Sequence, residues 1–327
     1  MKPTPLVCVG DACVDWVVRL PRWPAGPRPQ HGRIEWIGSG GSAANVASTV
    51  ARLGGAAALI ASVGRDPFAG LALSGPRAAG VDLSLVRVSR RSASGVFLSA
   101  RLAGGVVRTV AFPASAASLS GAALRRVGSP AAWFVSGHLL HSRGGAALAR
   151  TLRARVRRRR ELIATDLTPF EPRTARRLLR HHPGPVLLFT SLEGSQRRRR
   201  GSGLARRMLA ELGGATAVAV VKLGAAGSWI AAGSRAAHVP ALKAAVIDAL
   251  GAGDAYVGAF VWGWQRGLEL EACGLLGSAA GALCVSQPGT QGDWLSRAQM
   301  MKRLTRARLP RALAEARRAA LRALDRR

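Results

Sequence analysis

Cysteine is scarce in this 327-residue sequence, and its few occurrences fit neither disulfides nor a metal site. The four residues form no Cys-x-x-Cys pair and no metal-ligand spacing with the six histidines; they are Cys8, Cys13, Cys273 and Cys284. A disulfide framework would need closely spaced pairs, and a zinc site would need recurring ligand spacings. The sequence therefore favours a reducing compartment without structural zinc.

Long uninterrupted apolar runs are also lacking. The first run, Leu6 to Val9, is too short for the core of a signal peptide and runs into Asp11. The longest later run, residues 245–264, contains Asp248 and Asp254, which makes it a poor membrane span. We therefore expect a soluble, cytoplasmic protein with no membrane partner.

Acidic residues and lysines are few, which leaves a strongly positive chain. There are 17 acidic and 48 basic residues, 44 of them arginine, for a net charge of +31. Such a balance attracts nucleic acid through counterion release. The arginine runs at 157–160 and 197–200 are not interleaved with aromatic residues, however, and a nucleotide bias in the gene would also produce this composition. We interpret them as a solvated basic face, with no specific nucleic acid bound; a non-catalytic nucleic-acid-binding or regulatory protein is the alternative.

Two features are present. Apolar residues make up 48% of the chain, which is enough for a large core, and the sequence shows a repeated α/β pattern. Short apolar runs predict strands that alternate with helical stretches such as Ala147 to Arg160. The predicted strands are Leu6 to Gly10, Ala58 to Gly64, Trp133 to Ser136, Leu162 to Thr165, Val186 to Thr190 and Val218 to Leu223. This alternation predicts a largely parallel sheet with helices on both faces.

Two further segments predict a small second sheet. Residues 95–112 contain two β-rich runs around Gly104-Gly105, which is a hairpin signal. The segment from about 12 to 38 is typical of a strand, a loop and a second strand. A glycine-rich turn then opens a predicted helix, Ala43 to Leu53.

The most informative segment is Asp248-Ala249-Leu250-Gly251-Ala252-Gly253-Asp254. An apolar run enters a tight glycine turn and leaves as a helix, so the amides and the positive dipole end of that helix favour an anion there. Asp254 would repel a ground-state phosphate. Removal of a proton from an attacking hydroxyl is the role that fits it.

This segment closely resembles the C-terminal signature of the ribokinase family, the PfkB-type carbohydrate kinases. Other stretches resemble the family's motifs in the same order along the chain: Gly10 to Asp15, Gly40 to Asn45, Val63 to Gly70 and Val221 to Gly227. The resemblance covers residues 6 to about 290. It implies one ribokinase-like domain over residues 1–327, a three-layer α/β/α fold with a mostly parallel central sheet. A small β-sheet lid would come from about 12–38 and 95–112.

The resemblance also implies an activity and the residues that perform it. The enzyme would transfer the γ-phosphoryl group of ATP to a hydroxyl of a sugar or sugar-like molecule, with a nucleoside as the alternative substrate. Asp254 would be the general base, and the amides of Gly251, Ala252 and Gly253 would form the anion hole. Substrate hydroxyls would contact Asp15, Gly41 and Asn45, and the nucleotide would contact Lys222, Gly224 and Gly227.

Two departures from the family pattern concern the cofactors, which the resemblance gives as ATP, Mg²⁺ and, as a further candidate, a monovalent cation such as K⁺. The family's Asn-x-x-Glu motif reads Thr190-Ser191-Leu192-Glu193 here, so that Glu193 alone would order magnesium-bound water. Ala249 replaces a threonine beside the anion hole, while Asp248 would support the loop or a nearby monovalent cation. The sequence leaves open whether the lids pair into a homodimer.

A dinucleotide fingerprint competes for the glycine-rich turn. Gly38-x-Gly40-x-x-Ala43, with Asp66 downstream, fits the pattern of a dehydrogenase. That interpretation leaves the 251–254 segment unexplained. His138 and the tryptophans at 16, 23 and 36 are further candidates to contact substrate, with ordinary packing or surface positions as the alternative.

Overall fold

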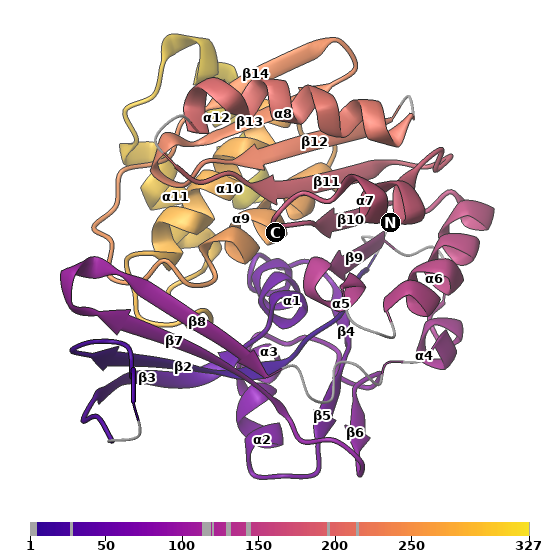
Figure 1. Cartoon of the computed structure of the whole chain (residues 1–327). Helices are drawn as coiled ribbons and strands as arrows, with labels where there is room; N and C mark the ends of the chain where they lie inside the picture. Colours follow the sequence, from indigo (N-terminus) through magenta and orange to yellow (C-terminus); the bar gives the residue numbers. More distant parts are fainter. Residues whose placement is uncertain are drawn as a thin grey trace.

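A computed structural model describes residues 5–26, 29–112, 119, 121–128, 132–141, 145–194, 197–213 and 216–326. Its centre is an eight-stranded sheet in the order β14-β13-β12-β11-β10-β9-β1-β4 (Figure 1). Six neighbouring strands are parallel: β12 (Ala217–Lys222), β11 (Val186–Ser191), β10 (Ile163–Asp166), β9 (Ala132–Ser136), β1 (Leu6–Val9) and β4 (Ala57–Ile60). An antiparallel hairpin of β13 (Ser228–Ala232) and β14 (Arg235–Val239) completes one edge. The predicted largely parallel sheet is confirmed.

Helices cover both faces of this sheet, and the alternation of side chains along β1 shows why. Leu6 and Cys8 face one apolar core, whereas Val7 and Val9 face the other, and all four are buried. The first core includes α1 (Ser42–Arg52), α9 (Ala252–Trp264), α10 (Leu270–Cys284), α11 (Arg297–Arg306) and α12 (Ala314–Asp325). The second includes α6 (Gly145–Arg159), α7 (Pro172–Leu179) and α8 (Arg197–Leu212). The result is the expected three-layer α/β/α arrangement.

A four-stranded sheet, called the lid sheet below, lies beside the main one (Figure 1). Its order is β3 (Arg33–Gly40), β2 (Cys13–Leu20), β7 (Gly95–Leu102) and β8 (Val107–Phe112). β2 pairs parallel with β7, and the other two pairings are antiparallel. The chain passes from β1 into β2 and from β3 into α1 within a few residues, so the two sheets join around Asp11 and Gly41.

The remaining elements are short. They are β5 (Ser62–Gly64), β6 (Arg87–Ser89), α2 (Phe68–Ala72), α3 (Ser74–Ala78), α4 (Gly121–Arg125) and α5 (Gly137–Leu140). The prediction of a single strand over Ala58 to Gly64 is wrong. The chain leaves the main sheet after Ile60, and β5 pairs with β6 instead. Among the described residues, no helix combines the length and the apolar character needed to span a membrane.

The position of α9 depends on close helix packing. α9 is buried almost throughout, between α1 and α10. A Cβ at Gly258 would lie 2.6 Å from the Cβ of Thr49 on α1, and one at Gly277 on α10 would lie 2.8 Å from the ring of Tyr256. Because Gly258 and Gly277 lack side chains, α1 and α10 can both pack closely against α9.

Candidate active site

A cavity of about 270 Å³ lies where the two sheets join. Its wall combines the end of β1, the starts of β2, α1 and α9, and the lid strands β7 and β8. The lining residues are Asp11, Ala12, Cys13, Asp15, Gly41, Ser42, Asn45, Gly95, Val96, Phe97, Ala111, Phe112, His138, Leu139, Leu250, Gly251, Asp254 and Thr290. The structure thus brings Asp254 and Gly251 together with all three residues expected to bind substrate.

Asp254 sits in the first turn of α9 and is held from α1. Its Oδ1 accepts a hydrogen bond from Ser42 Oγ at 2.7 Å, and its Oδ2 accepts one from Asn45 Nδ2 at 2.8 Å. Burial is the largest effect on this carboxyl and raises its pKa above the ordinary value, although the two hydrogen bonds and the charge of Lys222 oppose the rise. A raised pKa suits a carboxylate that must take up a proton.

Gly251 forms the turn that precedes α9. Its φ of 75° lies in the left-handed region, and a Cβ there would lie 2.8 Å from Thr290 Cβ. The first amides of a helix have no acceptor within the helix. Ala252 N lies a long 3.4 Å from the carbonyl oxygen of Ala249. The turn therefore presents Gly251, Ala252 and Gly253 at the positive end of a 13-residue helix.

A chain of side-chain hydrogen bonds fixes the amide of Asn45. Gln291 Nε2 donates to Asn45 Oδ1 at 2.7 Å, and Ser48 Oγ donates to Gln291 Oε1 at 2.9 Å. With its oxygen engaged in this way, Asn45 turns its Nδ2 group toward Asp254. Gln291 lies in the loop after α10 and belongs to none of the motifs identified in the sequence.

Asp15 is the deepest carboxylate of the cavity, with 3% of its surface exposed. Thr290 Oγ1 donates to its Oδ2 at 3.2 Å, and Cys13 Sγ lies 3.4 Å from its Oδ1. Burial, with smaller contributions from the charges of Asp254 and Asp11, raises its pKa from 3.8 to about 7. A Cβ at Gly40 would overlap this carboxylate, which explains a glycine at that position.

Lys222 lies at the end of β12, on the other side of the glycine turn. Its ammonium group forms an ion pair with Asp166 of β10, and a Cβ at Gly253 would lie 3.0 Å from Lys222 Nζ. Only 7% of its surface is exposed. A positive charge therefore sits directly against the predicted anion hole.

The predicted nucleotide loop is a tight turn between β12 and β13. Gly224 and Gly227 both have positive φ values, 56° and 88°, and Gly227 N donates to the carbonyl of Gly224 at 3.0 Å. A Cβ at Gly227 would overlap the carbonyl oxygen of Val239. Gly224 and Gly227 come two and five residues after Lys222, and neither is among the described residues that line the cavity.

Thr190 and Glu193 have separate environments. Thr190 is fully buried and its Oγ1 donates to the carbonyl of Leu167 at 2.6 Å, so it points into the sheet. Glu193 is exposed after the end of β11, at the same sheet edge as Lys222, and it does not line the cavity. In the part of the chain that the structure describes, no three His, Cys, Asp or Glu side chains gather as a metal site.

Several residues of the cavity were not predicted as site residues. Asp11 Oδ2 accepts the backbone N–H of Ser42 at 2.8 Å, while its Oδ1 is buried with no hydrogen-bond partner. Thr290 comes from the same loop as Gln291, and Phe97 and Phe112 come from the lid sheet. Asp11 stands within the Gly-x-x-x-x-Asp stretch, which was a usable signal; the loop and lid residues carry none.

Two alternatives receive no support from the described geometry. Asp66 accepts hydrogen bonds from the amides of Ser94 at 2.6 Å and Phe68 at 3.0 Å, so it joins two loops away from the glycine turn. Trp16 packs edge-on against Phe68, and neither it nor Trp23 or Trp36 lines the cavity. His138, in contrast, is an exposed residue of the cavity wall.

Comparisons with known proteins identify the family. The model of the pfkB family carbohydrate kinases matches residues 3–297. An uncharacterized sugar kinase of Archaeoglobus fulgidus is 38% identical over 74 residues, which are 23% of this chain and 30% of the relative. A nucleoside kinase of Methanocaldococcus jannaschii is 34% identical over 91 residues, 28% of this chain and 30% of the relative. The matched segments thus span less than a third of each relative.

The fold has close counterparts among solved structures. Arabidopsis thaliana ribokinase, solved with ribose and ATP, is similar with a TM-score of 0.71 at 20% identity, over 93% of this chain and 99% of that one. The structural match confirms the ribokinase-like fold. Since the family model also extends over most of the sequence, the chain belongs to the pfkB family of carbohydrate kinases.

Proposed function

We propose that the protein transfers the γ-phosphoryl group of ATP to a hydroxyl of an unphosphorylated sugar or sugar-like molecule. The observation that carries the proposal is the joint position of Asp254, the start of α9 and Asp15 on one cavity. A base, an anion-binding helix terminus and hydrogen-bonding groups for a polyol are the three parts that such a transfer needs.

In the proposed reaction, the acceptor hydroxyl attacks the γ-phosphorus in line with the departing ADP. The new O–P bond forms as the bond between the γ-phosphorus and the bridging oxygen breaks, and Asp254 takes the hydroxyl proton. The amides of Gly251, Ala252 and Gly253 would hold the charge that develops on the transferred group. Asn45 and Ser42 would keep the carboxylate of Asp254 aimed at the acceptor.

The nucleotide phosphates would lie on the Lys222 side of the turn. The ammonium group already faces Gly253, so it would move little to pair with a phosphoryl oxygen, and Asp166 would hold it in place until then. Gly224 and Gly227 would allow the nucleotide to approach the backbone. Glu193, exposed just after the end of β11, is the residue that would order magnesium-bound water at this sheet edge, where Asp166 is already paired with Lys222.

The chemistry of the lining supports a neutral acceptor. Three carboxylates line the cavity, from Asp11, Asp15 and Asp254, whereas no lysine or arginine is among the lining residues described. Carboxylates accept hydrogen bonds from sugar hydroxyls, but they repel a phosphate. We assign the carboxylates of Asp11 and Asp15, which both line the cavity, to the hydroxyl groups of the substrate.

A nucleoside is the second candidate acceptor, and the lid side of the cavity favours it. Phe97 and Phe112 line the wall with Val96 and Leu139, so a planar base has apolar and aromatic surface available. One of the sequence relatives is named a nucleoside kinase. The carboxylates would then bind the ribose part.

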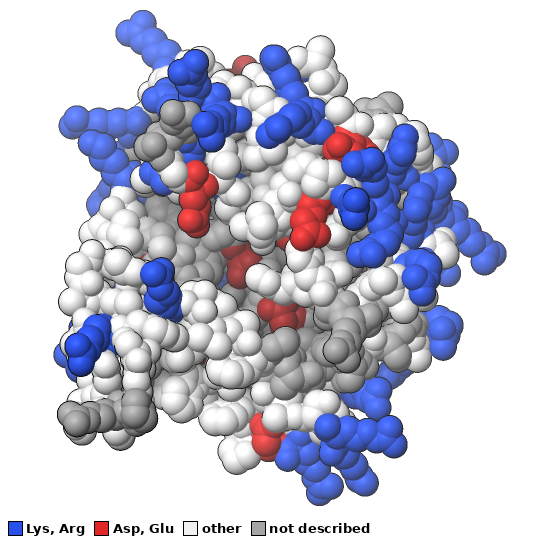
Figure 2. Space-filling view, in the orientation of Figure 1, with Lys and Arg blue, Asp and Glu red and all other residues white. Residues whose placement is uncertain are grey.

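The arginine-rich surface supports the non-catalytic alternative only weakly. Figure 2 shows lysines and arginines spread over several edges of the molecule, while acidic side chains are visible in the hollow at its centre. A nucleic-acid groove would instead have a continuous positive floor. We retain the prediction of no specific nucleic acid partner. Dimerisation through the lid sheet likewise stays a prediction.

The test is a substrate screen with purified protein. ATP consumption is measured with sugars, sugar phosphates and nucleosides, and a thermal-shift scan of the same compounds reports binding. We expect turnover with an unphosphorylated sugar or a nucleoside and none with the matching sugar phosphate. Salt-sensitive binding to oligonucleotides without ATP turnover would contradict the kinase assignment.

A further inference from the structure

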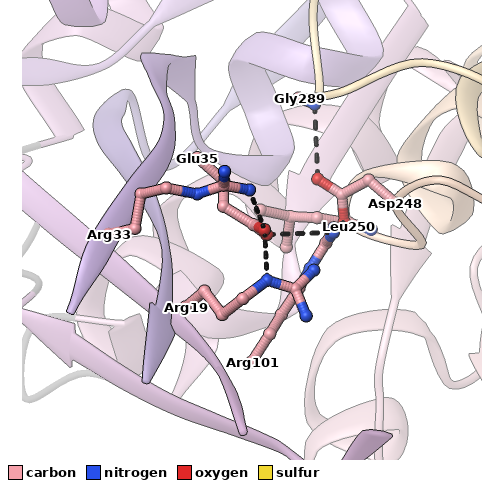
Figure 3. A network of polar contacts seen from close by, with 7 residues as sticks. All are labelled: Arg19, Arg33, Glu35, Arg101, Asp248, Leu250 and Gly289. Atoms are coloured by element: carbon pink, nitrogen blue, oxygen red, sulfur yellow. Dashed lines mark hydrogen bonds and ion pairs between the residues drawn. The ribbon is translucent and has the colours of Figure 1, made fainter. Parts of the chain in front are cut away.

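The surroundings of Asp248 do not fit a bound monovalent cation. Asp248 lies just before the glycine turn and is 5% exposed. Its Oδ1 accepts the amide N–H of Leu250 at 3.0 Å, and its Oδ2 accepts that of Gly289 at 3.3 Å (Figure 3). Nη2 of Arg101 lies 2.6 Å from Oδ1. Both carboxylate oxygens are therefore engaged by protein donors, and a guanidinium already supplies the positive charge.

Arg101 reaches Asp248 from the lid sheet. It belongs to β7, and its Nη1 also donates to Glu35 Oε2 at 3.3 Å. Arg19 and Arg33 hold the other oxygen of Glu35, at 2.6 and 3.4 Å (Figure 3). Arg101 therefore bridges two carboxylates, one on the lid and one beside the anion hole.

A bulge in the lid sheet explains why Glu35 is available for this contact. In the β2–β3 register, Val17 pairs with Trp36 and Val18 with Ile34, so Glu35 is the extra residue. A bulged residue leaves the regular alternation, and its side chain is re-aimed. Arg19 and Arg101 are register partners on β2 and β7, and the carboxylate of Glu35 offsets their like charges.

We propose that Arg101 is a positioning residue whose guanidinium takes the place of a monovalent cation at Asp248, so that phosphoryl transfer does not require K⁺. The proposal rests on the kinase function proposed above. It also couples the lid sheet to the anion hole, because Arg101 moves with β7 and Asp248 with the turn. The guanidinium keeps its charge at every working pH and offers donors to both carboxylates at once.

The consequence for catalysis follows from what Asp248 holds. One oxygen fixes the amide of Leu250, the residue before Gly251, and the other fixes Gly289, the residue before Thr290. Without a partner cation, the buried carboxylate would draw water or shift, and the turn would shift with it. A displacement of about 1 Å at reacting groups lowers turnover on the order of 100-fold.

The experiment compares three variants in potassium chloride and in choline chloride at equal ionic strength. Arg101→Gln removes the charge, Arg101→Lys retains it, and Arg19→Gln is the matched control, since Arg19 pairs with the same Glu35 but makes no described contact with Asp248. Initial rates are measured with the acceptor found in the screen. Thermal melting of the same proteins, with and without ADP, reports folding and cation binding independently of turnover.

We expect wild type and Arg19→Gln to turn over at rates within about threefold of each other in both salts. Arg101→Gln should lose on the order of 100-fold in choline. Addition of K⁺ or of low guanidinium should restore at least about tenfold of that loss and raise the melting temperature of Arg101→Gln only. Arg101→Lys should remain active in choline, and it serves as the test if Arg101→Gln does not fold.

Two results would overturn the proposal: a wild-type enzyme that requires K⁺, or a folded Arg101→Gln that keeps wild-type turnover in choline. A folded Arg101→Gln that neither cation rescues would also overturn it. If the wild type phosphorylates no acceptor, the kinase function has failed instead. The cation dependence of the melting temperatures still decides then whether Arg101 replaces a cation.

Discussion

Replacement of Asp254 by asparagine separates its chemical role from its structural one. Both carboxylate oxygens accept hydrogen bonds in the structure, from Ser42 Oγ at 2.7 Å and from Asn45 Nδ2 at 2.8 Å. An asparagine of the same shape keeps one acceptor for Asn45, and its amide group donates to the Ser42 hydroxyl, which also accepts. Neither contact has to break.

Asp254→Asn should therefore lower kcat without lowering the melting temperature. A general base contributes about 10²- to 10⁴-fold to a rate, so kcat should fall by that factor, which is about 3 to 5 kcal/mol of activation free energy. The melting temperature should stay the same or rise, because burial raises the pKa of Asp254 and an amide avoids the cost of burying its charge. Affinity for ATP should not decrease, since one negative charge has gone.

The assay is steady-state turnover across pH, together with nucleotide titration and thermal melting. Since the pKa of Asp254 is raised, wild-type kcat should fall with decreasing pH at a higher pH than an ordinary aspartate would give, and the variant should lack this limb. Asp66→Asn is the control, because Asp66 binds two backbone amides away from the cavity. The base assignment is refuted if folded Asp254→Asn keeps kcat within about tenfold of wild type.

Four other variants probe the site and the helix packing behind it. Burial raises the pKa of Asp15 from 3.8 to about 7. The stability that its protonation contributes is therefore fully present below pH 3.8 and is lost as pH rises through 7. Over this window, the free energy of unfolding of the wild type should fall by up to about 4 kcal/mol relative to that of Asp15→Asn. Lys222→Met should lower kcat about 10²- to 10³-fold in steady-state assays. Adding Asp166→Asn to it should recover stability in thermal melts without recovering kcat, and recovery of both would argue against Lys222 as a phosphate contact. Gly258→Ala should cost about 1–3 kcal/mol in denaturant titration, because its Cβ would meet Thr49; an unchanged midpoint would contradict the close packing of α1 on α9.

The sequence was most informative where the fold requires a backbone conformation that only glycine adopts easily. The turn at Gly251 needs a positive φ, and the sequence marks it with a glycine. The need for Gly258 between α1 and α9 was not predicted and is visible only in the structure. Strands of the parallel sheet were equally visible, because burial on both faces leaves continuous apolar runs. The break at Ala61 was not predicted, because Ala58 to Gly64 is one mostly apolar run that the main sheet and the two-stranded β5–β6 sheet share.

Contacts between loops that are distant in the chain could not be predicted from the sequence. Gln291 and Thr290 come from a loop after α10, and only the folded chain brings them to Asn45 and Asp15. Arg101 was one of 44 arginines, and nothing in its neighbourhood distinguishes it from those on the surface. Its role depends on the bulge at Glu35 and on the depth of Asp248, and both are properties of the three-dimensional structure.

The substrate cavity is lined by acidic residues, although the whole molecule is strongly basic. The chain carries +31, yet the cavity is lined by Asp11, Asp15 and Asp254 and, among the described residues, by no lysine or arginine. Lys222 stands on the opposite side of the glycine turn, against Gly253. At about 4 Å and an effective dielectric constant near 20, each pair of like unit charges costs about 4 kcal/mol. A phosphorylated acceptor facing even one of these carboxylates would thus bind on the order of 1,000-fold more weakly than its neutral counterpart, which makes the sugar and its sugar phosphate the most discriminating pair in the screen.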